Sequence, residues 1–296
     1  MHLSASAKGF MMMRPASLLA CAAMICSPGA SAGEQEPLRP VTVSYMAGGG
    51  TAHVTDAYLA PFSTTGWGTA FIYERSQALK SRPDTWSRLL SVELSLSRTH
   101  RNNTSNGTMW GAAVDVEAAA LRRFGQLPCG LRLAVGPSAE LLAGAYYRPS
   151  NSNNPAAARA ALTVGVTGRA ALGVNLFGLP VDLSYRPSLQ LLGAFFAPSY
   201  GQLYYEIYEG DSGNLCRFAW PGKRLSYSHL LAADLCFGAT QLRLGYSLRL
   251  LTQEASHLSV NAATHLFVIG ITTDFMTLNR RRDADSGIAR RIAYSF

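Results

Sequence analysis

Residues 89–99 read L-L-S-V-E-L-S-L-S-R-T, and this stretch decides the fold. From Leu90 onward apolar and polar residues alternate, so that leucines and Val92 point to one side while serines and Glu93 point to the other. A side-chain period of two is typical of a β-strand. A tilted strand needs about 9–11 residues to cross a bilayer, and this stretch is that long. The pattern therefore favours a transmembrane strand with one lipid-facing side and one polar, interior side.

The composition agrees with a membrane-embedded β-domain. The 296 residues are 48% hydrophobic and only 15% charged, whereas about 25% of residues are charged in an ordinary globular domain. The formal net charge of +8 is scattered along the chain apart from a run of three arginines at 280–282. We therefore expect no nucleic-acid partner. The 13 tyrosines suit the aromatic girdles that flank the apolar band of membrane barrels.

The N-terminal segment predicts export. Lys8 and Arg14 lie around the start of an apolar run, and Ala30–Ala32 provides a small-residue cleavage site. Together these form a secretory signal peptide, which we place at residues 1–32. A lipoprotein box ending at Cys21 is the alternative, although its apolar stretch would be short. The mature chain would contain no apolar run of 18 or more residues, and so no transmembrane helix.

Several further stretches repeat the alternation of the opening one. The expected strands are residues 40–46, 66–74, 89–99, 108–121, 131–147, 162–167, 181–186, 231–237, 242–250 and 263–275. Residues 117–123 also have a strong helix propensity, but the alternation and the flanking strands favour a strand there. Pro137 lacks a ladder donor, so we expect a bulge or kink at that position.

The connections between these strands alternate in length. Long ones are expected near Gly49, Asn103, Ser152, Asp211 and Ser256, and short ones near Pro128, Gly178 and Ala239. Long loops at one end and short turns at the other are typical of bacterial outer-membrane barrels. We predict an all-β fold: a transmembrane antiparallel up-and-down barrel of about ten strands over residues 33–276. A soluble secreted β-sandwich is the runner-up.

Two segments leave the strand count open. A hairpin within residues 197–225, or a strand at 289–296, would raise the count to twelve. Residues 277–296 are therefore either a basic C-terminal tail or a terminal strand.

Charged residues of both signs fall on the inferred interior face of the strands. They are Glu74, Glu93, Asp115, Glu117, Arg132, Glu140, Arg169, Asp182, Arg186, Asp234, Arg243 and Arg249. Side chains fill most of the interior of a barrel of this size, whereas water-filled pores need about 16 strands. We expect a closed, salt-bridged interior with a structural, binding or transport role. A narrowly gated conduit is the sharper alternative.

An enzyme acting on lipid or peptide at the extracellular rim is a second class of function. It needs a base close to a nucleophile or an activated water, and His53 with Asp56 is the one local His/Asp pair in a suitable loop. A third class is surface binding by the largest loop, for which Tyr204, Tyr205 and Trp220 are the candidate residues.

No cofactor or metal site is expected. Cys129, Cys216 and Cys236 remain after signal cleavage, and they form neither a CxxC spacing nor a cluster with histidines. A disulfide between any two of these three cysteines stays open.

Four motifs resemble a known family. They are D-A-Y-L-A-P at 56–61, N-S-N-N-P at 151–155, F-A-P-S-Y-G-Q-L-Y-Y-E-I-Y at 196–208 and H-L-F at 265–267. Together they resemble an uncharacterised domain family of outer-membrane β-barrel proteins from gut-dwelling Gram-negative anaerobes. The resemblance spans residues 41–275 and implies a barrel of unassigned activity, with no catalytic residues to carry over. It also implies an end near Met276, from which the tail at 277–296 departs.

These observations together predict an outer-membrane location. The expected partners are outer-membrane lipid and the barrel assembly machinery, with a small solute or surface ligand of unknown identity.

Overall fold

The computed structural model describes residues 40–101, 107–125, 127, 129–152, 154–176, 178–210, 214–237 and 240–276. The predicted signal peptide and the segment 277–296 lie outside the described residues. Among the residues described, no helix is both long and apolar enough to span a membrane.

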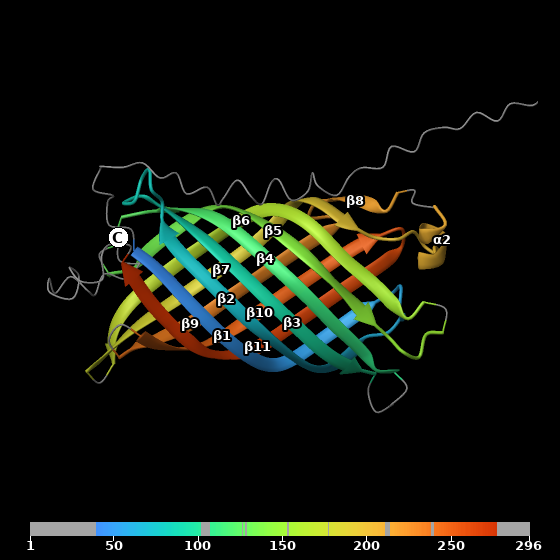
Figure 1. The fold of residues 1–296 in the computed structure, drawn as a ribbon, viewed down its shortest axis with the longest axis horizontal. Coiled ribbons are helices and arrows are strands. Elements are labelled where there is room, and N and C mark those ends of the chain that lie inside the picture. The colour runs from blue at the N-terminus through green and yellow to red at the C-terminus, as the bar shows by residue number, and fades with distance from the viewer. Residues whose placement is uncertain are drawn as a thin grey trace, which may run out of the picture. The chain divides into compact units, whose positions relative to one another are not determined.

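Ten antiparallel strands form a closed up-and-down barrel (Figure 1). They are β1 (Pro40–Asp56), β2 (Thr64–Ala78), β3 (Trp86–His100), β4 (Met109–Arg123), β5 (Arg132–Tyr147), β6 (Ala156–Leu176), β7 (Leu179–Phe196), β9 (Arg224–Cys236), β10 (Thr240–Ala255) and β11 (Leu258–Met276). Each of these strands pairs with the next, and β1 pairs with β11 to close the ring. The predicted fold class and the count of ten are confirmed.

The longest connection adds a short strand and a helix, but no barrel hairpin. Strand β8 (Cys216–Ala219) pairs only with the last four residues of β7, and α2 (Tyr204–Tyr208) is a single short helix. Both lie at one end of the barrel (Figure 1), which we call the α2 end. The opposite end, where β1 begins and β11 finishes, is the terminal end.

Strand β1 is longer than predicted, because the glycine run at 48–50 lies within it. Glycine runs usually mark turns, but here they allow a close approach between strands. A Cβ on Gly50 would lie 2.0 Å from the carbonyl oxygen of His265 in β11. The glycines therefore belong to the seam that closes the barrel.

The connection near Ser256, expected to be long, is a tight turn of two residues. Ser256 and His257 both have positive φ, 49° and 63°, as a type I′ hairpin requires. The other connections at the α2 end are longer: residues 57–63, 101–108, 148–155 and 197–223.

Of the bulge or kink predicted at Pro137, the bulge is wrong, although the pairing of β5 with β4 is interrupted at Gly136 and Pro137. Pairing of β5 with β6 runs through Pro137 and Val166 without a shift of register. The register shift lies instead between Val164 and Gly165 of β6, opposite β7. The missing N–H of a proline can be accommodated by the loss of one ladder bond, without an extra residue in the strand.

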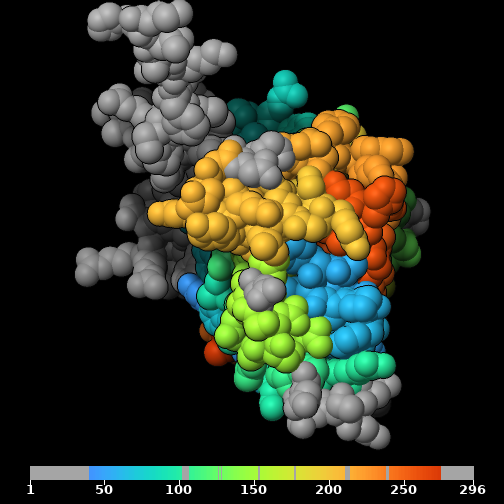
Figure 2. Space-filling view, turned by 90° about the vertical axis from the view of Figure 1, so that its right-hand side faces the viewer, coloured from blue at the N-terminus to red at the C-terminus, as the bar shows by residue number. Residues whose placement is uncertain are grey.

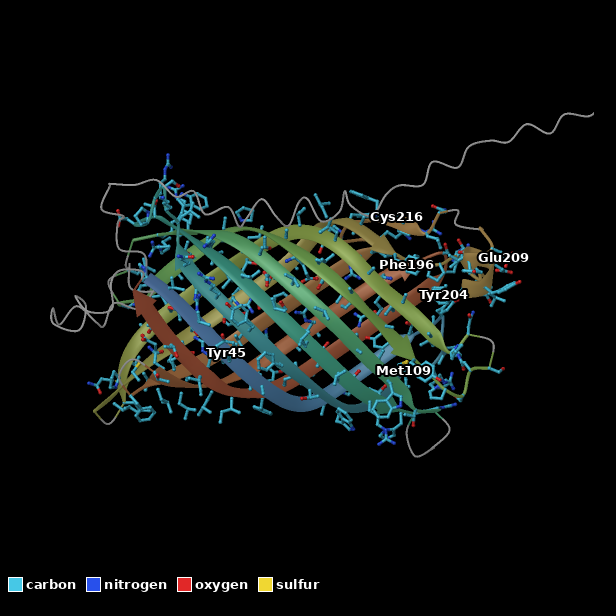
Figure 3. All side chains as sticks on the ribbon, in the orientation of Figure 1. Tyr45, Met109, Phe196, Tyr204, Glu209 and Cys216 are labelled. Carbon is cyan, nitrogen blue, oxygen red and sulfur yellow. The ribbon has the colours of Figure 1, made fainter. Side chains whose placement is uncertain are left out.

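The outward face of the barrel is strongly apolar. Large aliphatic and aromatic side chains stand off the ribbon all along the wall, as Figure 3 shows for Tyr45 on β1. Exposed members include Leu94, Leu96, Val114, Leu141, Leu162, Val164, Leu192, Leu244, Phe267, Ile269 and Ile271. Such a continuous exposed apolar surface is far larger than a soluble monomer carries.

Polar aromatic groups interrupt this surface on β9, β10 and β11. The Tyr227 hydroxyl lies 3.1 Å from His229 Nδ1, and the Tyr246 hydroxyl lies 2.6 Å from His265 Nδ1. Within each pair, the tyrosine and the histidine hydrogen-bond to each other, and this lowers the free-energy cost of placing polar groups on an apolar face.

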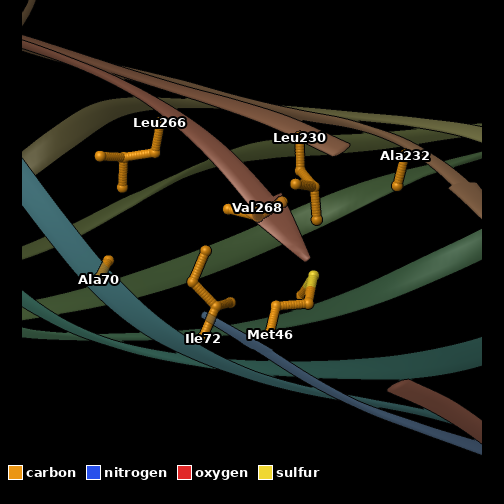
Figure 4. Close-up of a cluster of buried hydrophobic side chains, with 7 residues drawn as sticks. All are labelled: Met46, Ala70, Ile72, Leu230, Ala232, Leu266 and Val268. Atoms are coloured by element: carbon orange, nitrogen blue, oxygen red, sulfur yellow. The ribbon is translucent and has the colours of Figure 1, made fainter. Parts of the chain in front are cut away.

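Part of the interior is also apolar. Met46, Ile72, Leu230, Leu266 and Val268, with two alanines, pack together from β1, β2, β9 and β11 (Figure 4). Side chains therefore fill this section of the barrel, as the small strand number requires.

Candidate functional site

A first layer of ion pairs crosses the barrel interior through Arg243 of β10. Its guanidinium donates Nε and Nη2 to the two carboxylate oxygens of Asp234 on β9, both at 2.7 Å. Its Nη1 donates to Oε2 of Glu74 on β2 at 3.1 Å. Two strands, β11 and β1, separate β10 from β2 in the wall, so the bond to Glu74 passes through the interior. Arg243, Asp234 and Glu74 are almost fully buried.

The same layer continues to the far wall through Glu74. Arg186 of β7 lies 3.4 Å from Glu74 Oε1 and 2.8 Å from Glu117 Oε2 on β4. Arg169 of β6 approaches Glu74 to 4.0 Å, and Ser188 donates a hydrogen bond of 2.6 Å to Glu117. Carboxylates and guanidinium groups of this layer thus join six different strands across the interior.

A second layer lies nearer the α2 end and is centred on Arg249 of β10. Arg249 contacts Asp115 at 2.6 Å, Glu93 at 3.3 Å and Glu140 at 3.7 Å. These acids lie on β4, β3 and β5, on the other side of the barrel. The Arg249 side chain is 24% exposed, against 1% for Arg243, so water reaches this layer more readily than the first.

All twelve charged residues that the alternation placed inside lie in ion pairs. The remaining pair joins Arg132 of β5 to Asp182 of β7 at 3.2 Å, near the terminal end. The strand period alone is enough to find these residues, because one face of every strand points inward.

The structure does not bring His53 and Asp56 together. Both lie on β1 rather than in a loop, and three residues along a strand place side chains on opposite faces. His53 points outward, with its ring 6.3 Å from that of His265, whereas Asp56 is 3% exposed and points inward. The expectation of a local His/Asp pair fails for this reason.

Asp56 instead lines a hollow at the α2 end. The hollow is small, with a cavity volume of about 40 Å³, and it is open to solvent. Its walls include Asp56, Tyr58, Arg159, Phe196, Tyr204 and Gln253. Sequence analysis missed Arg159, which lies before the predicted start of its strand but on the same inward face as Arg169.

The connection 197–223 partly covers this hollow. Figure 2 faces the α2 end and shows this segment in gold beside the end of β1 in blue. The Tyr58 hydroxyl donates to the carbonyl oxygen of Gln202 at 3.0 Å, and the backbone N–H of Ala158 donates to the Tyr204 hydroxyl at 2.6 Å. Burial raises the pKa of Tyr58 to about 12, so its phenol stays protonated and donates this bond at neutral pH.

The three candidate residues of the large loop have different positions. Tyr204 points to the barrel, where its ring stacks with that of Phe196 at 6.4 Å (both labelled in Figure 3). Tyr205 is 69% exposed, and Trp220 is also exposed. Only Tyr204 therefore belongs to the hollow.

The described residues contain no group of three or more His, Cys, Asp or Glu that could hold a metal ion. Within the part of the chain that the structure describes, Cys129, Cys216 and Cys236 form no disulfide.

The class that this geometry defines is a closed β-barrel of outer-membrane type, with an ion-paired interior and a hollow at one mouth. The chain belongs to the family described as protein of unknown function (DUF3316), whose model matches residues 16–282. The predicted family of unassigned activity is confirmed to this extent. No curated protein matches the sequence.

Solved barrels show a distant likeness. The translocator domain of the autotransporter NalP from Neisseria meningitidis is 12% identical, with a TM-score of 0.37 over 88% of this chain and 96% of that one. The outer-membrane protease OmpT from Escherichia coli is 7% identical, with a TM-score of 0.39 over 83% and 99%. The COG4313 outer-membrane channel from Pseudomonas putida F1 is 10% identical, with a TM-score of 0.33 over 84% and 100%. Similarities of this size carry no information about activity.

Proposed function

We propose that this protein is a sealed outer-membrane barrel that acts through its exposed mouth rather than as an open pore. The observation that carries this proposal is the bond from Arg243 to Glu74, a fully buried ion pair that crosses the interior between β10 and β2, two strands that are not neighbours in the wall. A water-filled channel would leave these groups hydrated and apart. Here both side chains are almost fully buried and contact each other.

The exposed apolar wall supports the membrane location. Leu94, Leu162 and Val164 are each about half exposed in the middle of their strands. Lipid tails would cover these side chains, whereas water would not favour them. The predicted signal peptide agrees with export to the outer membrane of a Gram-negative cell. A source in gut-dwelling anaerobes stays a prediction, as does contact with the barrel assembly machinery.

The connection lengths support one orientation. Outer-membrane barrels carry short turns on the periplasmic side and longer loops outside. The longest connection, residues 197–223, lies at the α2 end. The hollow would then face the exterior of the cell.

Single-channel recording in planar bilayers tests the seal. We expect wild type to pass no steady current. Arg243→Ala combined with Arg249→Ala, which removes the centres of both ion-pair layers, should show openings. Lys223→Ala should stay silent, because Lys223 forms only an exposed pair with Glu254 at 3.9 Å. A steady ohmic current through wild type would overturn the proposal.

A narrowly gated conduit is the second candidate, favoured by the partial exposure of Arg249. The same recordings separate the two functions, because a gated conduit would open reversibly in wild type as voltage or pH changes. A rim enzyme has no comparable support, since His53 and Asp56 lie on opposite faces of β1.

A further inference from the structure

We propose that the hollow at the α2 end binds a small zwitterion with an apolar or aromatic side chain, of the chemical class of a free α-amino acid or a short peptide. Asp56 would hold the ammonium group and Arg159 the carboxylate. This inference goes beyond a sealed barrel and does not depend on the seal.

Asp56 supplies a carboxylate that no cation of the described residues contacts directly, although the Arg159 guanidinium attracts it from across the hollow. Its Oδ1 accepts a hydrogen bond of 3.0 Å from the backbone N–H of Tyr58, and no Lys, Arg or His of the described chain forms an ion pair with it. Its side chain is nevertheless almost fully buried. A buried carboxylate is costly unless it is paired, so a ligand ammonium group would complete this site.

Arg159 supplies the opposite charge on the same hollow. Its Nη1 donates to the Tyr146 hydroxyl at 2.9 Å, and its guanidinium lies over the Tyr146 ring at 4.6 Å. These contacts fix the position of the guanidinium but do not neutralise it. In the part of the chain that the structure describes, no carboxylate lies within ion-pair distance of Arg159, unlike the arginines of the two interior layers. A guanidinium with unused N–H groups is well suited to a carboxylate.

The separation of these two charges points to a zwitterion. Asp56 and Arg159 line one hollow but form no ion pair with each other, so a ligand that carries both charges can satisfy both. A neutral sugar would satisfy neither charge fully. A simple anion would leave Asp56 unpaired, and a simple cation would leave Arg159 unpaired.

Aromatic rings supply the wall for the rest of the ligand. Phe196 and Tyr204 stack with an interplanar angle of 19°, and Tyr58 meets Tyr204 edge-on at 5.7 Å. Such rings favour apolar and aromatic groups. The two hydrogen bonds from Tyr58 to Gln202 and from Ala158 to Tyr204 hold this wall over the hollow, so the covering connection would retain a bound ligand.

Four phenylalanine derivatives test the charge requirement on the intact barrel in detergent micelles. They are L-phenylalanine, phenylalanine amide, N-acetylphenylalanine and N-acetylphenylalanine amide, which carry both charges, only the positive, only the negative and neither. Calorimetry or equilibrium dialysis should show that L-phenylalanine binds at least ten-fold more tightly than each of the others. Equal binding of all four, or no binding of L-phenylalanine, would overturn the inference.

Two variants assign each charge to its residue. Asp56→Asn should weaken the binding of L-phenylalanine at least ten-fold and leave the binding of N-acetylphenylalanine unchanged. The asparagine oxygen can still accept the hydrogen bond from the backbone N–H of Tyr58, so the local structure is kept. Arg159→Gln should weaken the binding of L-phenylalanine by a similar factor and leave the binding of phenylalanine amide unchanged. Glu254→Gln, at an exposed site, is the matched control and should change nothing. Weakening of all four compounds alike by either variant would contradict these roles. Because bilayer recordings measure the seal independently, a failure here is distinguishable from a failure of the proposed function.

Discussion

Replacing Arg243 with methionine is the sharpest test of the interior ion pairs. Methionine keeps most of the side-chain volume but removes the charge and all five donors. The change breaks two bonds of 2.7 Å to Asp234 and one of 3.1 Å to Glu74. Asp234, which is 0% exposed, then keeps, among the described residues, the side-chain hydrogen bond of 3.1 Å from Thr272.

The expected loss of stability follows from the charge left behind. Removing one partner of a buried ion pair typically costs about 3–5 kcal/mol, because the other partner stays buried and uncompensated. Glu74 keeps Arg186 at 3.4 Å, so most of the cost falls on Asp234. We therefore expect Arg243→Met to lower the free energy of unfolding by about 3–5 kcal/mol. Arg243→Met combined with Asp234→Asn should recover part of that loss, since the uncompensated charge is gone.

Equilibrium unfolding in urea, with the barrel folded into lipid vesicles, measures this difference. The shift between boiled and unboiled mobility on a gel reports the folded fraction independently. Lys223→Met is the control, because an exposed ion pair contributes only about 0–1 kcal/mol. The reasoning would be refuted if Arg243→Met destabilised the barrel no more than Lys223→Met does, or if the double variant were as unstable as the single one.

Two further predictions concern the wall. Leu94→Lys should cost about 2–4 kcal/mol in vesicle folding, the usual penalty for a cation near the bilayer midplane. Glu93→Gln, one residue away on the interior face, should assemble normally. If the two changes had equal effects, the assignment of the lipid-facing and interior sides of β3 would be wrong. Gly50→Ala should reduce the yield of folded barrel, because its Cβ would meet the His265 carbonyl oxygen at 2.0 Å. Gly49→Ala should be tolerated, since its nearest neighbour would be 3.8 Å away; folding yields that do not differ would contradict the close approach at the seam.

The barrel and its charged interior are predictable from the sequence because both depend on a period of two. Once the strand at residues 89–99 is recognised, Glu93 must point away from Leu94, and the same rule applies to Arg243 and Arg249. The ion-pair partners are not predictable in this way. The partners depend on which strands face each other across the barrel. This in turn depends on how the sheet closes and on how the strand register is staggered around the barrel.

The extent of β1 and the hollow were not predictable for different reasons. The glycine run at 48–50 has the composition of a turn, and only its close contact with β11 makes it part of a strand. That misreading placed His53 and Asp56 in a loop, where they could have met. The hollow depends on how the aperiodic connection 197–223 folds over Arg159, and no local pattern encodes that contact.

The strands are expected to turn most of their large apolar side chains to lipid and their ion-paired charges to the interior. Quenching of a fluorophore by lipids brominated in the middle of their acyl chains tests this claim most directly. The fluorophore is attached through Leu94→Cys in a protein whose three mature-chain cysteines are replaced by serine, and through Tyr205→Cys on α2 as the control. We predict strong quenching at position 94 and none at position 205. An unquenched fluorophore at position 94 in the folded protein would contradict the account.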